Sequence, residues 1–136
     1  MVSYSRILVG IDGSKQSEMA AKCAVDIAKK YGACVCLLNV HPTPGHLEHY
    51  SAQEMKEEGE KLLNSSIKIM KRAGVMHRAT IEVGNPAGQL LEVAEKGKFD
   101  LIILGSHGMG RAERFLLGSV STRVATHAKT SVLIVR

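Results

Sequence analysis

The sequence predicts an α/β protein whose parallel sheet is doubly wound by helices. Short apolar runs alternate along the chain with segments in which apolar residues recur every three or four positions. Residues that form turns or cap helices stand between these segments, and the second apolar run is nearly continuous, as in a strand buried on both faces. Strands that alternate with helices require right-handed crossovers, which cover both faces of the sheet.

The first strand is predicted over residues 6–11, and it stops at the turn-forming sequence Asp12-Gly13-Ser14. A helix follows and ends before Gly32. Its core-facing positions, at helical spacing, are Ala20, Cys23, Ala24, Ile27, Ala28 and Tyr31. Residues 33–40 form the second strand.

The middle of the chain predicts a loop, a long helix and a third strand. Residues 41–45 contain two prolines and a glycine, so they cannot continue a strand. The helix begins near Ser51, where Glu54 completes a capping box, and Gly74 ends it. Its predicted inner face consists of Met55, Leu62, Leu63, Ile67, Met70 and Ala73. Residues 75–83 form the third strand.

Two further helix and strand pairs complete the pattern. Asn85 and Pro86 open a third helix, which ends at Gly97. Its predicted core positions are Ala87, Leu90, Leu91 and Ala94. Strands are predicted over residues 99–104 and 131–135, and the helix between them starts at about Gly118. That helix is expected to direct inward Val120, Val124, Ala125 and Ala128.

The length of 136 residues fits a single domain, residues 1–136. No run approaches the roughly 20 apolar residues that cross a bilayer, and the N-terminal segment lacks the long apolar core of a signal peptide. The three cysteines, Cys23, Cys34 and Cys36, show no Cys-x-x-Cys spacing. We expect these cysteines to be small buried hydrophobic residues, with a redox function as the alternative. We also expect the protein to be cytoplasmic.

The net charge of +5 and the isoelectric point near 9.2 would suit an anionic partner. The charges are dispersed, however, and two Phe, three Tyr and no Trp provide little aromatic surface on which bases can stack. The composition therefore argues against nucleic acid as the partner.

A glycine-rich segment follows the fourth predicted strand and reads Gly-Ser-His-Gly-Met-Gly-Arg-Ala-Glu-Arg-Phe-Leu-Leu-Gly-Ser-Val-Ser from Gly105 to Ser121. Its glycines let backbone N–H groups approach an anion, and Gly118-Ser119 can open a helix whose N-terminus favours negative charge. The segment lacks the lysine of a P-loop and the third glycine of a dinucleotide fingerprint. The pattern predicts a nucleotide ligand bound in another way.

The candidate site is predicted at one edge of the sheet. Asp12, Val40 and Gly105 each end or follow a predicted strand. Parallel sheets bind ligands beyond the carboxyl ends of their strands, where the connections reverse direction. These three residues are therefore expected to converge, although they lie far apart in the sequence.

Gly105, Gly108, Gly118 and Ser119 together form the pattern Gly-x2-Gly-x9-Gly-Ser. This pattern resembles the signature of ATP-binding universal stress proteins. The resemblance covers nearly the whole chain, because the strand ends are also similar. They read Ile7-Leu8-Val9-Gly10-Ile11-Asp12-Gly13-Ser14, Leu37-Leu38-Asn39-Val40-His41 and Gly118-Ser119-Val120-Ser121.

The resemblance implies a five-stranded parallel sheet of order 3-2-1-4-5, similar to the adenine nucleotide alpha hydrolases. It implies ATP or AMP as the ligand, with Mg²⁺ or Mn²⁺ beside a triphosphate. Asp12 matches the acidic position near adenosine, and the backbone of Val40 matches the position that recognises adenine. The positions that match those around ribose and phosphates are Gly105, Gly108, Met109, Gly118, Ser119, Val120 and Ser121.

Several side chains near this pattern have two interpretations. The hydroxyls of Ser119 and Ser121 can donate to phosphate oxygens. Arg111 and Arg114 either add positive charge at the site or only solvate a helix surface. Asp12 either lies at the ligand or serves only in the turn that caps the first helix.

Histidines raise the question of a metal site. His107 either contacts an anion or is an exposed loop residue. His41, His46 and His49 follow the second strand, but no carboxylate or thiolate at conventional spacing completes a zinc site. We expect residues 41–49 to form a loop over the adenine pocket.

The leading hypothesis is an ATP-binding, nucleotide-responsive module that forms a homodimer. The last strand is apolar and lies at a sheet edge in the implied order, so a second copy is expected to cover it. The alternative is a slow ATP hydrolase or an adenylyl-transferring enzyme, although the segment offers no obvious general base, nucleophile or phosphate lysine. A third hypothesis is an interaction module without nucleotide.

Overall fold

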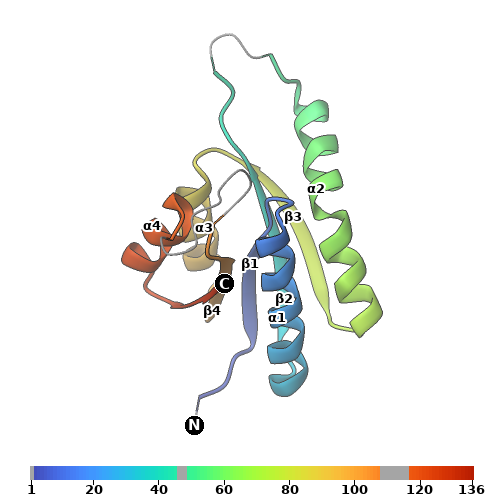
Figure 1. Ribbon diagram of the computed structural model, residues 1–136, viewed down its shortest axis with the longest axis vertical. Coiled ribbons are helices and arrows are strands. Elements are labelled where there is room, and N and C mark those ends of the chain that lie inside the picture. Colours follow the sequence, from blue (N-terminus) through green and yellow to red (C-terminus); the bar gives the residue numbers. More distant parts are fainter. Residues whose placement is uncertain (1, 46–48, 108–116) are drawn as a thin grey trace.

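The computed structural model describes residues 2–45, 49–107 and 117–136, and it contains a parallel sheet between two layers of helices (Figure 1). Within this part of the chain the sheet has five strands in the order β3-β2-β1-β4-β5. The strands are β1 (Arg6–Gly10), β2 (Cys34–His41), β3 (His77–Val83), β4 (Leu101–Gly105) and β5 (Ser131–Val135). The predicted fold class and strand order are confirmed.

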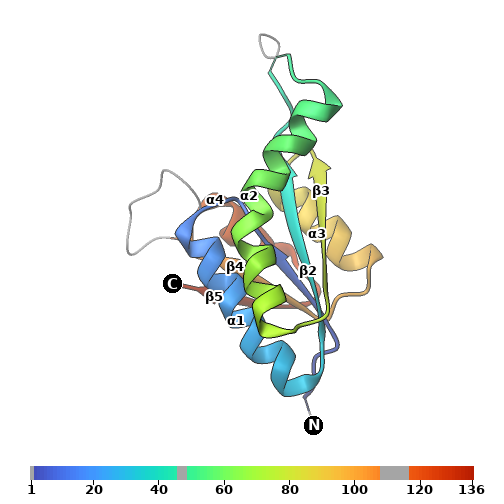
Figure 2. The ribbon, with the colours of Figure 1, turned by 90° about the vertical axis from the view of Figure 1, so that its right-hand side faces the viewer.

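Two helices cover each face of the sheet. The helices are α1 (Lys15–Tyr31), α2 (Ala52–Ala73), α3 (Pro86–Lys96) and α4 (Ser119–His127). Helices α1 and α2 pack together on one face, and α3 and α4 pack together on the other (Figure 2). Every connection from a strand to its helix therefore leaves from the carboxyl edge of the sheet, where the candidate site is predicted.

The polar residues that precede three of the helices are N-caps. The side chains of Ser14, Ser51 and Asn85 accept hydrogen bonds from backbone N–H groups in the first turns of α1, α2 and α3. Gly32 and Gly74 end α1 and α2 at φ values of 69° and 70°, a left-handed conformation that favours glycine. The predicted start and end signals of these helices are confirmed.

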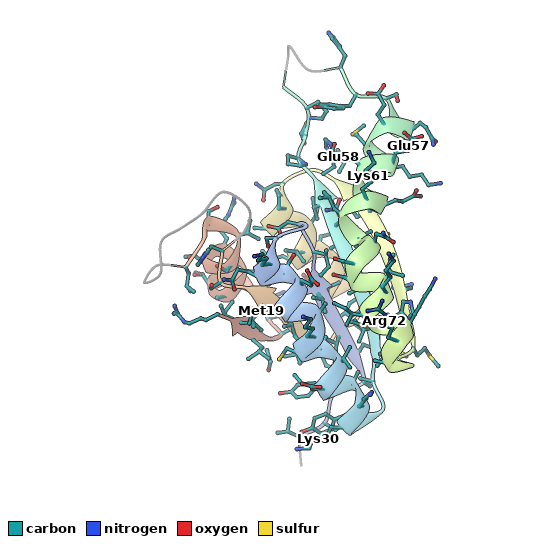
Figure 3. All side chains as sticks on the ribbon, turned by 45° about the vertical axis from the view of Figure 1, so that its right-hand side comes forward. Met19, Lys30, Glu57, Glu58, Lys61 and Arg72 are labelled. Carbon is teal, nitrogen blue, oxygen red and sulfur yellow. The ribbon has the colours of Figure 1, made fainter. Side chains whose placement is uncertain are left out.

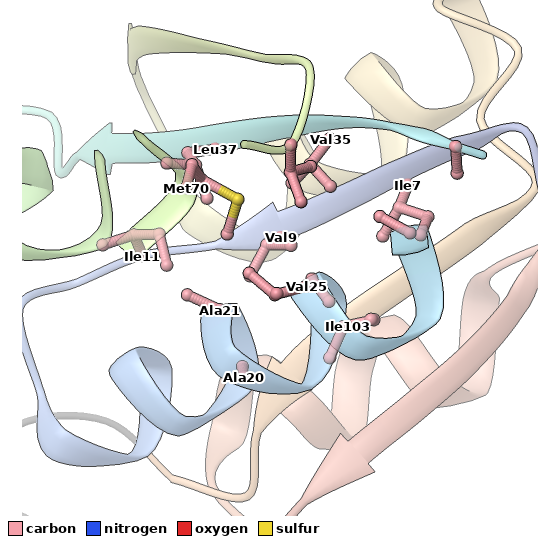
Figure 4. Packing of buried hydrophobic residues seen from close by; sticks show 14 of the residues in the cluster. Ile7, Val9, Ile11, Ala20, Ala21, Val25, Val35, Leu37, Met70 and Ile103 are labelled. Carbon is pink, nitrogen blue, oxygen red and sulfur yellow. The ribbon is translucent and has the colours of Figure 1, made fainter. Parts of the chain in front are cut away.

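The core consists of two clusters separated by the sheet. On β1, Ile7 and Val9 face α1 and α2, whereas Leu8 faces α3 and α4, and all three are fully buried. Figure 4 shows Ile7 and Val9 among residues of β2, β4, α1 and α2. Because β1 is buried on both faces, its side chains contribute to the core on both sides of the sheet.

Helix α2 extends past the sheet at its N-terminal end. Figure 3 shows Glu57, Glu58 and Lys61 on this half of the helix and Arg72 near its other end. All four residues are exposed. The outer surface of the helix is therefore charged and of mixed sign, in agreement with the dispersed charges of the sequence.

Some inward-facing positions were predicted wrongly. Ala125 is exposed, because the buried residues of the short helix α4 are Ser121 and Val124. The buried face of α2 includes Gly59 and Ser66, which the hydrophobic pattern did not indicate. Other predicted inward positions are half-buried: Cys23, Tyr31, Met55 and Leu62, and also Ile27, Ile67, Ala73, Leu91, Val120 and Ala128, which pack against the core clusters as predicted.

Strands β3 and β4 begin two residues later than predicted. Val75 N donates to Met70 O at 3.2 Å, and Phe99 N donates to Ala94 O at 3.0 Å. These bonds close the last turns of α2 and α3. The apolar side chains of Val75 and Phe99 are buried, but their backbones belong to helix ends and not to the sheet.

The three cysteines are free thiols. Cys36 is buried on β2, whereas Cys23 and Cys34 are half-buried. Burial raises the pKa of the Cys36 thiol, and burial together with the nearby Asp26 carboxylate raises the pKa of Cys23. A raised thiol pKa disfavours the reactive thiolate, so these two cysteines act as small hydrophobic residues.

Among the residues that the structure describes, no helix combines the length and apolar character that a membrane crossing requires.

We expect truncation of a buried side chain in a central strand to destabilise the protein strongly. Ile103 on β4 is fully buried, so Ile103→Ala should lower the free energy of unfolding by about 2–5 kcal/mol through lost burial and a residual cavity. Met76→Ala is the control, because Met76 is 72% exposed, and it should change stability by less than about 0.5 kcal/mol. Urea unfolding measures both, and equal effects would contradict the core assignment.

Candidate functional site

A cavity of about 400 Å³ lies at the carboxyl edge of the sheet. It is formed where β1, β2 and β4 end and where α4 begins, next to the point at which the strand order reverses. Its volume is in the range of small-molecule sites. Its lining comprises Gly10, Ile11, Asp12, Ser14, Ser17, Leu38, Asn39, Val40, Pro42, Leu62, Pro86, Leu90, Leu104, Gly105, His107, Gly118, Ser119, Val120 and Ser121.

All the predicted site residues that the structure describes line this one cavity. They are Asp12, Val40, Gly105, Gly118, Ser119, Val120 and Ser121. Gly108 and Met109, like Arg111 and Arg114, lie outside the described residues. The expected convergence of the strand ends is therefore found in the structure for Asp12, Val40 and Gly105.

Asp12 both lines the cavity and shapes the turn after β1. Its Oδ1 accepts a hydrogen bond from Ser14 N at 2.9 Å, which is the geometry of an Asx turn. Its backbone N donates to the hydroxyl of Ser17 at 3.3 Å. Gly13 supports the turn with a φ of 85°. The side chain is exposed, so the turn holds a carboxylate at the mouth of the cavity.

Gly105 allows β4 to end against the first turn of α1. A Cβ at this position would lie 2.7 Å from Gln16 Cβ and 2.9 Å from the backbone carbon of Gln16. Neither atom is the end of a flexible side chain, so a larger residue would push α1 and β4 apart. Glycine at position 105 thus brings two walls of the cavity together.

The carbonyl of Ser106 anchors the start of α4. It accepts hydrogen bonds from Gly118 N at 2.6 Å and from Ser121 Oγ at 2.8 Å. Ser121 Oγ also lies 3.1 Å from Gly118 O, and the residue is buried. The hydroxyl of Ser121 is thus engaged with the backbone, whereas Ser119 is exposed in the first turn.

The N-terminus of α4 lacks the side-chain cap of the other three helices. Its N-cap is Gly118, and among the described residues no side chain caps it with a hydrogen bond. Uncapped N–H groups and the helix dipole together favour an anion. Because Gly118, Ser119 and Val120 also line the cavity, this N-terminus opens into it.

Val40 lies on β2 beyond the last pair that β2 forms with β1, which is at Leu38. Successive residues of a strand between two parallel neighbours direct their N–H and C=O groups alternately to one neighbour and the other. Leu38 O accepts from Ile11 N at 2.8 Å on the β1 side, whereas His41 O accepts from Gly84 N at 2.9 Å on the β3 side. Val40 therefore directs both backbone groups toward the side where β1 has ended.

Much of the remaining lining is aliphatic. No Phe, Tyr or Trp is among the described residues that line the cavity. Leu62 of α2 contributes to the lining and packs over Gly13, since a Cβ on Gly13 would lie 2.5 Å from Leu62 Cδ2. Leu62 was predicted only as a core residue, because its helical spacing gives no sign that its turn of α2 reaches the edge of the sheet.

His41 lies next to the cavity wall but is engaged elsewhere. Its Nε2 lies 3.2 Å from Glu58 Oε2 on α2, and its Nδ1 lies 2.8 Å from Pro42 O. Its ring also meets the ring of Tyr50 edge to face, with centroids 5.4 Å apart. Across residues 2–45, 49–107 and 117–136, no three His, Cys, Asp or Glu side chains are placed to hold a metal ion.

His107 also borders the cavity, as a half-buried residue. Its Nδ1 lies 3.1 Å from the hydroxyl of Ser106, whose carbonyl anchors α4. The imidazole is therefore held beside the N-terminus of α4.

The chain matches known proteins over almost its entire length. The model of the universal stress protein family matches residues 3–136. A universal stress protein of Methanocaldococcus jannaschii is 37% identical over 140 residues, which cover 98% of this chain and 82% of that protein.

Two solved structures with adenine nucleotides share the fold. A crystal structure of a universal stress protein in complex with cAMP has a TM-score of 0.79 at 32% identity and covers 99% of both chains. An AMP-bound family protein from Arabidopsis thaliana has a TM-score of 0.71 and covers 96% of this chain and 90% of that one, but at 18% identity it supports the fold alone. From the family match and the identity to these relatives, the chain belongs to the universal stress protein family.

Proposed function

We propose that this protein binds an adenine nucleotide, ATP or AMP, in the cavity and acts as a nucleotide-responsive stress protein. One observation carries the proposal: the free backbone groups of Val40 and the uncapped N-terminus of α4 open into the same cavity. The first suits a base and the second suits a phosphate. The cAMP in the structure of the relative at 32% identity supports the same ligand class.

The backbone of Val40 favours adenine over guanine. Adenine offers an acceptor at N1 beside a donor at its 6-amino group, which complement an N–H donor and a C=O acceptor. Guanine offers a donor at N1 and an acceptor at O6, so its pattern is reversed. In the proposed complex the base pairs with Val40 as the next strand would, between the aliphatic side chains of Leu62 and Leu90.

The sugar and phosphates extend from the base toward α4. Asp12 presents a carboxylate that can accept hydrogen bonds from ribose hydroxyls. Phosphate oxygens accept from the first N–H groups of α4 and from the hydroxyl of Ser119. In this proposal Gly108 and Met109 contribute as the signature implies.

A divalent ion would accompany a triphosphate without a protein metal centre. Mg²⁺ typically keeps several waters and binds through one or two carboxylates and the phosphates of its ligand. The described lining of the cavity includes a single carboxylate, Asp12. Mg²⁺ or Mn²⁺ would therefore be held mainly by phosphate oxygens and water, and it would neutralise phosphate charge.

A binding module fits the described lining better than a rapid hydrolase. The lining contains one carboxylate and one imidazole, His107, but no lysine or cysteine. Asp12 is bonded in its turn and His107 lies beside Ser106, so neither is positioned by a further acid or base. We place the protein in the cytoplasm, in keeping with its three free thiols.

Nucleotide retained by the purified protein tests this proposal. Mass spectrometry after denaturation should find ATP or AMP in the parent protein, and Gly118→Val should lose it. A Cβ on Gly118 would lie 3.0 Å from His107 Cα, so valine displaces the start of α4 from the cavity. Titration calorimetry with ATP and Mg²⁺ should show binding weakened at least about tenfold, equivalent to about 1.4 kcal/mol.

Gly88→Val is the matched control, because a Cβ there meets only ordinary contacts at 3.5 Å or more and the residue is exposed. It should bind as the parent does. A parent protein that carries no nucleotide and does not bind added ATP would sink the proposal. Rapid multiple-turnover release of ADP, abolished by Gly118→Val, would instead favour a hydrolase.

We also propose a homodimer through β5. Val132, Leu133, Ile134 and Val135 are all only half-buried on this edge strand. An apolar edge strand invites pairing with a second copy. Light scattering at high micromolar concentration should give twice the chain mass, and Val132→Lys should shift it toward the monomer. Val83→Lys, on the opposite edge strand, should remain dimeric; a monomeric parent would contradict the proposal.

A further inference from the structure

The side chain of Asn39 donates to the carbonyl that a continued ladder would offer to the N–H of Val40. In a parallel ladder in which even-numbered residues of β2 bond toward β1, the N–H of Val40 is due to pair with Ile11 O. In the structure Ile11 O accepts instead from Asn39 Nδ2, at 2.9 Å. The ladder between β1 and β2 therefore stops one step short.

The preceding step of the same ladder is intact. Ile11 N donates to Leu38 O at 2.8 Å, so the backbone of Ile11 is still beside β2 when its carbonyl turns to Asn39. The end of pairing thus coincides with the side-chain bond from Asn39 to Ile11, just before the turn at Asp12.

Asn39 is held firmly in this position. It is 3% exposed and projects from β2 toward the layer of α1 and α2, as Leu37 does. Its Oδ1 is buried and has no partner among the described residues. A Cβ on Gly59 of α2 would lie 3.1 Å from this oxygen and 2.7 Å from Ile81 Cδ1, so a glycine there makes room for the amide.

A buried polar side chain with an unpartnered oxygen lowers the stability of the fold. An apolar residue at position 39 would suit its apolar neighbours better. What the amide of Asn39 provides, and an apolar side chain would not, is an N–H donor. This donor binds the carbonyl of Ile11.

We propose that Asn39 is a positioning residue for base recognition: its amide holds the carbonyl of Ile11 and so leaves the N–H of Val40 free to donate to adenine N1. This inference deepens the proposed function and rests on it for the ligand. The end of strand pairing, and with it the open backbone pair at Val40, is thus set by one side chain.

The test uses Asn39→Leu, which keeps the side-chain size but removes the donor. Asn64→Leu, on the exposed surface of α2, is the matched control. In the ligand-free protein, NMR hydrogen exchange of the Val40 amide should become about tenfold slower in Asn39→Leu, because Ile11 O then accepts from Val40. If Asn39 has only a structural role, the Val40 amide should exchange faster in the variant, because loss of the hydrogen bond to Ile11 would make the end of β2 more mobile.

Binding supplies the second measurement. Asn39→Leu should bind AMP about tenfold more weakly, the cost of one hydrogen bond, while inorganic tripolyphosphate should bind within about twofold of the parent. An equal loss for both ligands, or unchanged AMP binding, would overturn the inference. Asn39→Ala, which adds no bulk beside Gly59, gives the same two measurements if the leucine variant does not fold.

The two proposals fail separately. If the parent protein does not bind AMP, the nucleotide proposal falls, but the exchange rate of the Val40 amide still decides the role of Asn39. If the parent binds AMP and both Asn39 variants bind it equally well with unchanged Val40 exchange, only the role of Asn39 is refuted.

Discussion

The unequal lengths of β1 and β2 determine the rest of the site. The two strands are paired from Arg6 with Cys34 to Gly10 with Leu38, and β2 then continues to His41 against β3 alone. One side of β2 is thereby left without a neighbouring strand, and the chain after β1 turns away through Asp12 and Gly13. The cavity is the space that this early ending creates, with α2 and α4 as its outer walls.

The start of α4 depends on a different anchor. The carbonyl of Ser106 receives the backbone N–H of Gly118 and the hydroxyl of Ser121, so α4 starts at a fixed distance from the end of β4. Among the described residues no side chain caps the helix. Backbone groups at the end of β2 and at the start of α4 therefore frame the two sides of the cavity.

The sequence predicted the structure best at residue types that favour one particular backbone conformation or position. Gly32, Gly74 and the N-caps marked helix ends, and alternating periodicities led to the α/β class. Strand ends also placed Asp12, Val40 and Gly105 at a common edge. Ala125 was misassigned because a short helix touches the sheet over few residues, and Val75 was placed in a strand although its N–H closes a helix.

Two contributors to the site could not be predicted from their own neighbourhoods. Leu62 lines the cavity and packs over Gly13, which belongs to a turn far away in the sequence. Asn39 stands in an apolar strand, where its spacing suggests only a buried position. Its bond to Ile11 joins residues 28 positions apart and becomes visible only when both strands are in register.

The open pair at Val40 consists of an N–H and a C=O that every residue type except proline possesses. The side chain at position 40 can therefore vary without loss of these two groups. Alanine scanning would miss them, and comparison of side chains would not mark the position. In the proposed complex the base is selected at this position by a gap in strand pairing, so a change in the register of β1 and β2 would remove the selection while leaving residue 40 itself unchanged.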